Sequence, residues 1–135
     1  MNLFLVEDSN FLRERLTRMI SRLGGIQIVG SASTASEAIA RISQTRPDVV
    51  LLDIRLAQGT GLDVLQHLKQ QPAAPVVIVL TNFAYPQYRK KYLRAGADFF
   101  FDKSTEFELT LQALQQLRYR FTQSSATTRQ YSFIA

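Results

Sequence analysis

Two kinds of hydrophobic pattern alternate along this chain. Short runs of consecutive apolar residues, clearest at 49–52 and 76–80, predict strands buried on both faces. Three further runs predict strands at 2–6, 26–30 and 97–101. Between the runs, apolar residues recur three and four positions apart, which is typical of helices with one buried face. The pattern therefore predicts five strands that alternate with five helices.

Turn and capping residues mark where these helices begin and end. The first helix should end at Gly24 and Gly25, and the second before Pro47. The third follows Gly61, and the fourth covers about 86–95. Capping boxes are predicted for the second helix from Thr34 with Glu37 and for the fifth from Thr105 with Glu108. The first helix is expected to bury Phe11, Leu12, Leu16, Met19, Ile20 and Leu23.

Strands that alternate with helices predict an α/β fold with a mostly parallel sheet covered on both faces. The carboxyl ends of parallel strands meet at one edge, where open α/β sheets bind their ligands. Four of the predicted strands end in polar residues, so the pattern predicts a site at that edge. These residues are Glu7, Asp8, Asp53, Thr81 and Lys103.

Composition narrows the chemistry of such a site. The 135 residues fit one domain, and the absence of cysteine together with a single histidine excludes disulfides, zinc-thiolate sites and multi-histidine metal sites. No apolar stretch has the length of a membrane span, and a strand begins almost at Met1, so we expect a cytoplasmic protein without a signal peptide. The net charge of +5 is spread over 16 basic residues, so no direct nucleic-acid binding is expected.

The acidic residues at the strand ends favour phosphoryl chemistry. Three neighbouring carboxylates repel one another unless a cation neutralises them, and an all-oxygen site favours Mg²⁺. Mg²⁺ at carboxylates typically pairs with phosphate oxygens, which Lys103 and Thr81 would also contact. A carboxylate can itself be the nucleophile that forms an aspartyl phosphate. Asp53, at the end of a central strand, is the best candidate.

In order and spacing these residues resemble the receiver domain of two-component response regulators. The match covers residues 2 to about 122, and it rests on the acidic pair after the first strand, Asp53 with Gly61 eight positions later, Thr81, the 96–98 triplet and Lys103. The resemblance implies a doubly wound five-stranded parallel sheet of order 2-1-3-4-5, a flavodoxin-like three-layer sandwich. It divides the chain into a receiver domain, 1–122, and a Ser/Thr/Gln-rich tail or start of a linker, 123–135.

The resemblance also implies a role for each site residue. Asp53 would accept a phosphoryl group from the phosphohistidine of a sensor histidine kinase or a phosphotransfer protein. The implied Mg²⁺ ligands are Asp8, Asp53 and the backbone carbonyl of Arg55, with Glu7 acting through water. Lys103 would contact the phosphoryl group, Thr81 would move toward it, and Phe100 would be the switch aromatic.

The implied protein is a signalling switch rather than an enzyme, and it has a downstream protein target. A homodimer through the fourth and fifth helices is one interface that it suggests. Tyr85, Tyr88 and Tyr92 on the fourth helix fit either a half-buried stripe or such an interaction surface. The alternative is the receiver half of a DNA-binding transcriptional regulator whose output domain is absent from this chain.

Two other functions with related chemistry fit less well. A dehalogenase-type phosphatase would need a second acid two residues after Asp53, where this chain has Arg55. A flavodoxin-like flavin site needs a hydroxyl-rich and amide-rich phosphate loop, where Glu7 and Asp8 would repel the flavin phosphate.

The chain also departs from the receiver pattern at several positions. Ser104 replaces the usual proline, so we expect no cis peptide bond there and a different last loop. The bulky residues Arg55, Asn82 and Phe83 should screen the phosphoryl group from water, which predicts slow self-dephosphorylation.

Overall fold

The structure is a computed structural model that describes the backbone of residues 1–134 and the side chains of residues 1–122. Five strands form one parallel sheet in the order β2-β1-β3-β4-β5, as predicted. The long apolar runs at 49–52 and 76–80 lie in its central strands because both faces of a parallel sheet are covered. The strands are β1 (Asn2–Val6), β2 (Gln27–Ala32), β3 (Val49–Leu52), β4 (Val76–Thr81) and β5 (Phe99–Asp102).

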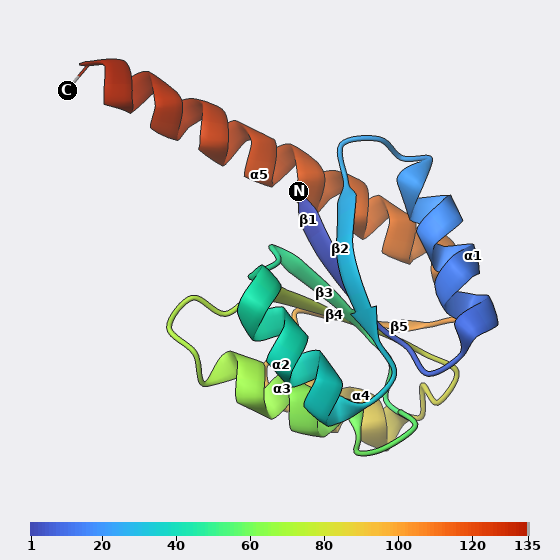
Figure 1. Cartoon of the computed structure of the whole chain (residues 1–135). Helices are drawn as coiled ribbons and strands as arrows, with labels where there is room; N and C mark the ends of the chain where they lie inside the picture. Colours follow the sequence, from blue (N-terminus) through green and yellow to red (C-terminus); the bar gives the residue numbers. More distant parts are fainter. Residues whose placement is uncertain (135) are drawn as a thin grey trace.

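Helices cover both faces of this sheet (Figure 1). Two of them, α1 and α5, lie on one face, and the other three lie on the opposite face. This is the doubly wound three-layer sandwich that the resemblance implied. The helices are α1 (Asn10–Ser21), α2 (Ala35–Thr45), α3 (Gly61–Lys69), α4 (Pro86–Arg94) and α5 (Phe107–Ile134).

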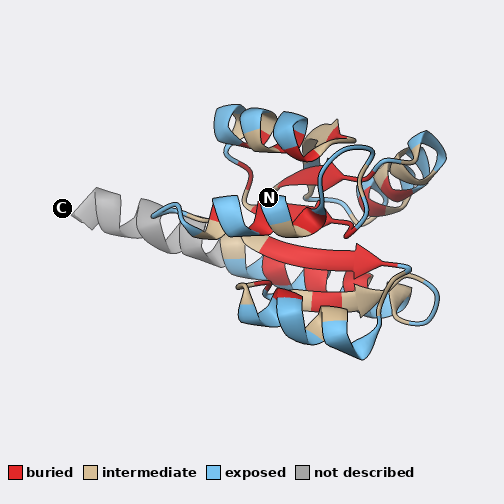
Figure 2. Cartoon of the chain, turned by 90° about the horizontal axis from the view of Figure 1, so that it is seen from below, coloured by how far each residue is buried: buried red, intermediate tan, exposed pale blue. Residues whose placement is uncertain are grey.

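Each central strand divides its apolar side chains between two cores, because successive side chains of a strand point to opposite faces. In β3, Val49 and Leu51 pack with α1 and α5, whereas Val50 and Leu52 pack with α2, α3 and α4. Figure 2 shows the buried residues concentrated on the sheet and on the inner sides of the helices. A strand held on both faces gives the residue after it a fixed position, which matters for Asp53.

Several predicted boundaries and caps were wrong. Strands β2 and β5 begin one and two residues later than expected. The Thr34 side chain caps α2, but Glu37 pairs with Arg41 instead of closing a capping box. Helix α5 begins at Phe107, so Thr105 does not cap it. The reciprocal box is the one between Thr60 and Asp63 at α3.

One expected core residue also lies outside the core. Phe11, at the beginning of α1, is 66% exposed, although Leu16 and Ile20 of the same apolar stripe are buried. The sheet contacts only the later turns of the stripe, so helical spacing alone overestimated the buried face.

Helix α5 continues to Ile134, beyond the boundary predicted at residue 122. The side chains of 123–135 lie outside the described residues, so the division between receiver domain and tail stays a prediction. Among the helices that the structure describes, none combines the length and the apolar character that a membrane span requires.

Candidate functional site

Backbone hydrogen bonds continue the sheet by one residue beyond the strand ends and fix three of the predicted site residues. The amide of Glu7 donates to the carbonyl of Ala32 at 3.0 Å, and the amide of Asp53 donates to that of Val6 at 3.0 Å. The amide of Lys103 donates to the carbonyl of Thr81, also at 3.0 Å. The sheet itself therefore sets the backbone position of each of these side chains.

Lys103 joins the two buried carboxylates at this edge. Its Nζ lies 2.7 Å from Oε2 of Glu7 and 2.8 Å from Oδ2 of Asp53. Both carboxyl side chains are buried, with Glu7 3% and Asp53 6% exposed. The other oxygen of Asp53, Oδ1, accepts from the amide of Ile54 at 2.6 Å. Charge-assisted contacts of this kind hold a side chain in one orientation.

The charges at this edge are only partly balanced. Burial and, to a smaller extent, the negative charge of Asp53 raise the pKa of Glu7 to about 7, although Lys103 acts in the opposite direction. For Lys103, burial alone would lower the pKa, but the attraction of Asp53 and Glu7 outweighs burial and the pKa is raised. The ammonium therefore stays charged near neutral pH, and two carboxylates share one cation.

A third carboxylate completes an acidic cluster. Glu7, Asp8 and Asp53 each offer one oxygen, and these oxygens all lie within 4.8 Å of one another. Asp8 is exposed, so the cluster opens to solvent on its side. An all-oxygen set with excess negative charge fits a hard divalent cation such as Mg²⁺ better than a transition metal.

The loop after β3 packs tightly against Asp53. The amide of Gly61 donates to the carbonyl of Ile54 at 2.8 Å. A Cβ atom on Gly61 would lie 2.3 Å from the carbonyl oxygen of Asp53, so only glycine fits there. The eight-residue spacing between Asp53 and Gly61 thus has a steric cause.

Two other predicted site residues lie at or just after the ends of β4 and β3. Thr81 is fully buried at the end of β4, and its Oγ1 accepts from the amide of Phe83 at 3.1 Å. Within the described side chains the Thr81 hydroxyl makes no hydrogen bond to the side chain of Asp53 or Lys103. Arg55 is exposed, and its guanidinium lies 4.1 Å from the centre of the Phe83 ring. The loops that follow β3 and β4 are therefore joined across the edge of the sheet.

Comparison with known proteins identifies this arrangement. The family model described as the response regulator receiver domain matches residues 3–115. The chain belongs to this family. Receiver domains are signalling modules of two-component systems that bind Mg²⁺ at an acidic pocket, and this chain has an acidic cluster of Glu7, Asp8 and Asp53.

The relatives of this receiver domain are response regulators. It is 34% identical over 113 residues to an uncharacterized response regulatory protein of Vibrio cholerae, covering 84% of this chain and 46% of the relative. It is 34% identical to the positive alginate biosynthesis regulatory protein of Pseudomonas aeruginosa, covering 86% of this chain and 46% of the relative. The chain thus spans about half the length of these relatives.

Solved structures agree in fold. The crystal structure of a DNA-binding response regulator of the LuxR family from Staphylococcus aureus has a TM-score of 0.80 and 27% identity, covering 87% of this chain and 98% of that chain. The response regulator domain of Thermotoga maritima CheB has a TM-score of 0.76 at 24% identity, covering 89% and 94%.

In this receiver domain a tertiary contact that the sequence did not reveal surrounds Phe100. The ring of Phe100 is buried, and the guanidinium of Arg89 on α4 lies 5.1 Å from its centre. Arg89 also donates to the carbonyl of Phe100 at 3.1 Å and to Glu106 at 2.9 Å. Glu106 in turn accepts from the amide of Asp102. Arg89 and Glu106 are 17 positions apart, so no local pattern predicts their contact.

Ser104, at the position where the receiver pattern has a proline, makes two hydrogen bonds in the last loop. Its amide and hydroxyl donate to Oδ1 of Asp102 at 2.9 and 2.6 Å, and these two bonds lower the pKa of Asp102. A proline could make neither bond, because it has no amide hydrogen and no hydroxyl. The peptide bond between Lys103 and Ser104 is trans.

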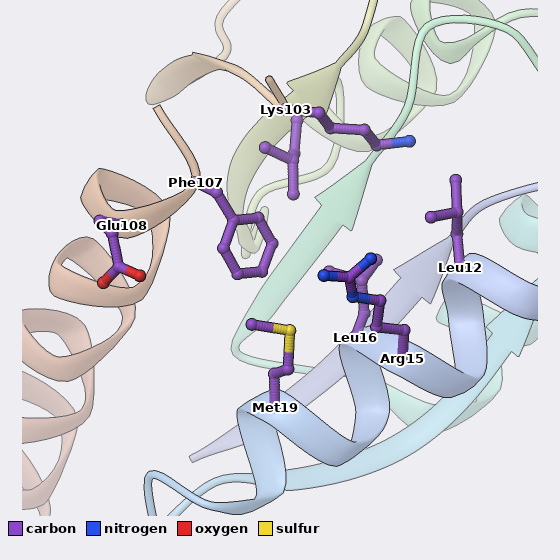
Figure 3. A pocket seen from close by; sticks show the side chains of 8 residues that line it. Leu12, Arg15, Leu16, Met19, Lys103, Phe107 and Glu108 are labelled. Carbon is purple, nitrogen blue, oxygen red and sulfur yellow. The ribbon is translucent and has the colours of Figure 1, made fainter. Parts of the chain in front are cut away.

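A pocket of about 320 Å³ lies beside the site, between α1 and α5. Figure 3 shows the Lys103 amine directed away from Phe107, while the guanidinium of Arg15 extends over the pocket. The pocket therefore borders the Lys103 stem but does not contain the acidic cluster. Its lining residues are Leu12, Arg15, Leu16, Met19, Leu80, Lys103, Phe107 and Glu108.

Proposed function

We propose that this chain is a phosphorylation-dependent switch in which Asp53 accepts a phosphoryl group from the phosphohistidine of a sensor histidine kinase or a phosphotransfer protein. The observation that carries the proposal is the bridge from Lys103 to both Asp53 and Glu7, at 2.8 and 2.7 Å, beside the third carboxylate of Asp8. It supplies a buried nucleophile, a cation for phosphoryl oxygens and an oxygen-rich metal site in one place.

In the proposed transfer, a carboxylate oxygen of Asp53 attacks the phosphorus of the donor. A bond between that oxygen and phosphorus forms, the phosphorus–nitrogen bond breaks, and the histidine nitrogen leaves with the bonding pair. Catalysis here depends on position and on charge neutralisation. The β3 core and the amide of Ile54 fix Asp53, and the ammonium of Lys103 would stabilise the negative charge on the phosphoryl oxygens.

Mg²⁺ would be held by Asp8, Asp53 and the backbone carbonyl of Arg55, with Glu7 contributing through water. The ion would neutralise part of the negative charge of donor and acceptor. The residues fit this role because their oxygens lie within 4.8 Å of one another and carry more negative charge than Lys103 balances.

Phosphorylation would act on the rest of the domain through Thr81 and Phe100. A phosphoryl group on Asp53 offers new acceptor oxygens to the Thr81 hydroxyl, which would exchange its bond with the Phe83 amide for one with phosphate. Movement of Thr81 and Phe100 would alter the surface formed by residues 81–103. Signalling then requires a downstream partner with different affinities for the two states.

A second candidate is the receiver half of a DNA-binding transcriptional regulator. It is favoured by the chain spanning 46% of its curated relatives and by the likeness to a DNA-binding response regulator of the LuxR family. In that protein the surface formed by residues 81–103, together with a homodimer contact through α4 and α5, would control an attached output domain.

The deciding experiment offers Mg²⁺ and a small phosphodonor, acetyl phosphate, to the wild type and to Asp53→Asn. The wild type should acquire one acid-labile, Mg²⁺-dependent phosphoryl group, and Asp53→Asn should acquire none. Asp63→Asn is the matched control, because Asp63 is exposed in the α3 capping box and asparagine keeps an acceptor there. Equal labelling of wild type and Asp53→Asn, labelling of neither, or an acid-stable label would contradict the proposal.

A further inference from the structure

The middle of the chain carries positive charge without acidic neighbours in sequence. Residues 64–97 contain no aspartate or glutamate, and four of their basic residues lie on the short helix α4. Residues 109–135 also lack acids, but their three arginines, at 118, 120 and 129, are fewer and more widely spaced. Positive charge is therefore densest on α4, which carries four basic residues within six positions.

Some of these bases are neutralised by tertiary contacts and others are not. Lys69 pairs with Asp98 at 2.8 Å, and Arg89 pairs with Glu106 at 2.9 Å. The remaining three, Lys90, Lys91 and Arg94, are exposed, and none forms an ion pair with the side chains that the structure describes. The outward face of α4 is thus cationic.

Helix stability does not account for all of this charge. Lys91 and Arg94 lie in the last turn, where the helix dipole favours cations. Lys90 and Arg94, however, are four positions apart on one face, where like charges repel and destabilise a helix by a few tenths of a kcal/mol. An anionic partner would remove that repulsion.

Apolar side chains are exposed beside these cations. Tyr85 is 54% exposed at the beginning of α4, and Leu93 is 42% exposed between Tyr92 and Arg94. The tyrosine stripe is therefore divided: Tyr92 packs in the core against Phe100, and Tyr85 faces solvent. Tyrosine and arginine, both present on this surface, are enriched at protein interfaces.

We propose that this α4 basic surface, made of Tyr85, Lys90, Lys91, Leu93 and Arg94, binds an acidic segment of a partner protein that also presents an apolar or aromatic side chain. A protein segment fits better than a nucleic acid. Three unpaired cations on a nine-residue helix would neutralise few phosphates, and the exposed Leu93 has no role in phosphate binding.

This acidic segment would belong to the downstream partner that recognises the surface formed by residues 81–103, and in that respect the inference rests on the proposed function. The link is Arg89, which lies on the same helix and holds the carbonyl of Phe100 and the side chain of Glu106. A change at Phe100 would therefore reposition α4 and its cations. Binding by the surface in the present state can still be measured without any phosphorylation.

The test selects binders to the unphosphorylated full chain from a displayed library of random dodecapeptides. Selected peptides should carry net negative charge with at least one apolar or aromatic residue. The double variant Lys90→Glu/Arg94→Glu should bind a selected peptide about tenfold or more weakly than the wild type, because two attractive charge pairs become repulsive. The affinity of the wild type for the peptide should also fall as the salt concentration rises. The matched control is the double variant Arg18→Glu/Arg22→Glu, an exposed pair with the same spacing and charge change at the end of α1, which should bind as the wild type does.

The outcomes separate this proposal from the others. Selection of neutral or basic peptides, or equal loss of affinity in both double variants, would overturn it. Tighter binding of a double-stranded DNA than of any selected peptide would replace it with a nucleic-acid surface. The library could instead yield no binding peptide, while the wild type dimerises with rising concentration and the double variant Lys90→Glu/Arg94→Glu stays monomeric. That result would assign the surface to a second copy of this chain. Asp53 labelling by acetyl phosphate is scored separately, so failure here leaves the proposed function standing.

Discussion

The guanidinium of Arg55 stacks on the ring of Phe83, 4.1 Å from its centre, and so joins the loops that follow β3 and β4 on either side of Asp53. An exposed cation–π contact of this kind contributes about 0.5–1 kcal/mol. The sequence-based prediction of slow dephosphorylation assigns to this pair the screening of a phosphoryl group on Asp53 from water.

We therefore expect Phe83→Ala to shorten the lifetime of phosphorylated protein several-fold, measured as loss of phosphoryl label after the donor is removed. Phe83→Tyr, which keeps the aromatic face, should retain the long lifetime. Phe11→Ala, at an exposed phenylalanine on α1, is the control for side-chain truncation. If the phosphorylated Phe83→Ala variant has the same lifetime as the wild type, Phe83 does not screen the phosphoryl group from water.

Removal of the Lys103 charge should destabilise the metal-free protein. Lys103→Met leaves Glu7 and Asp53 facing each other without a cation, and breaking such a buried pair costs about 3–5 kcal/mol. The raised pKa of Glu7 lets that residue take up a proton and relieve part of the cost, so the loss should be smaller at pH 6 than at pH 8. Urea unfolding at the two pH values measures this, and equal losses would show that Glu7 does not respond.

Glu7 should also make the stability of the metal-free wild type depend on pH. Its pKa is raised from 4.5 to about 7 in the folded protein, so the folded state holds an extra proton between these values. The associated stability is complete below pH 4.5 and is lost as pH rises through about 7, by up to roughly 3 kcal/mol. The free energy of unfolding of Glu7→Gln, measured by urea titration, should not change with pH between 4.5 and 7. Mg²⁺ should raise the Tm of the wild type more at pH 8 than at pH 6, because below pH 7 it competes with that proton.

Arg89 should hold Phe100 and the loop after β5 in their present positions. Arg89→Met removes the bonds to the carbonyl of Phe100 and to Glu106, and Glu106 then loses support for its bond to the amide of Asp102. We expect faster hydrogen exchange at the Asp102 amide and a loss of about 1 kcal/mol of stability. Lys90→Met, the exposed neighbour, is the control and should leave exchange unchanged. Protection of Asp102 that survives in Arg89→Met would show that Glu106 holds the loop unaided.

Much of the fold follows from local pattern. The doubly buried runs at β3 and β4 predicted central parallel strands because only a sheet covered on both faces accepts uninterrupted apolar residues. The polar residues at the strand ends predicted one edge, since parallel strands all end there. The structure brings Glu7, Asp53 and Lys103 into direct contact at that edge. Caps and strand starts were less predictable: Glu106 accepts from the amide of Asp102, and α5 begins at Phe107 rather than after Thr105.

The sequence alone thus determined the order of elements, the identity of the acidic cluster and the position of Asp53, because each depends on periodicities of two and 3.6 residues and on the direction of parallel strands. Only the tertiary structure decided how the charges are shared and which surfaces are free. Lys103 bridges two carboxylates rather than one and Phe11 is exposed. Among the described side chains, Arg89 forms an ion pair and Lys90 forms none. These properties depend on distances between residues far apart in the chain, and no local periodicity encodes such distances.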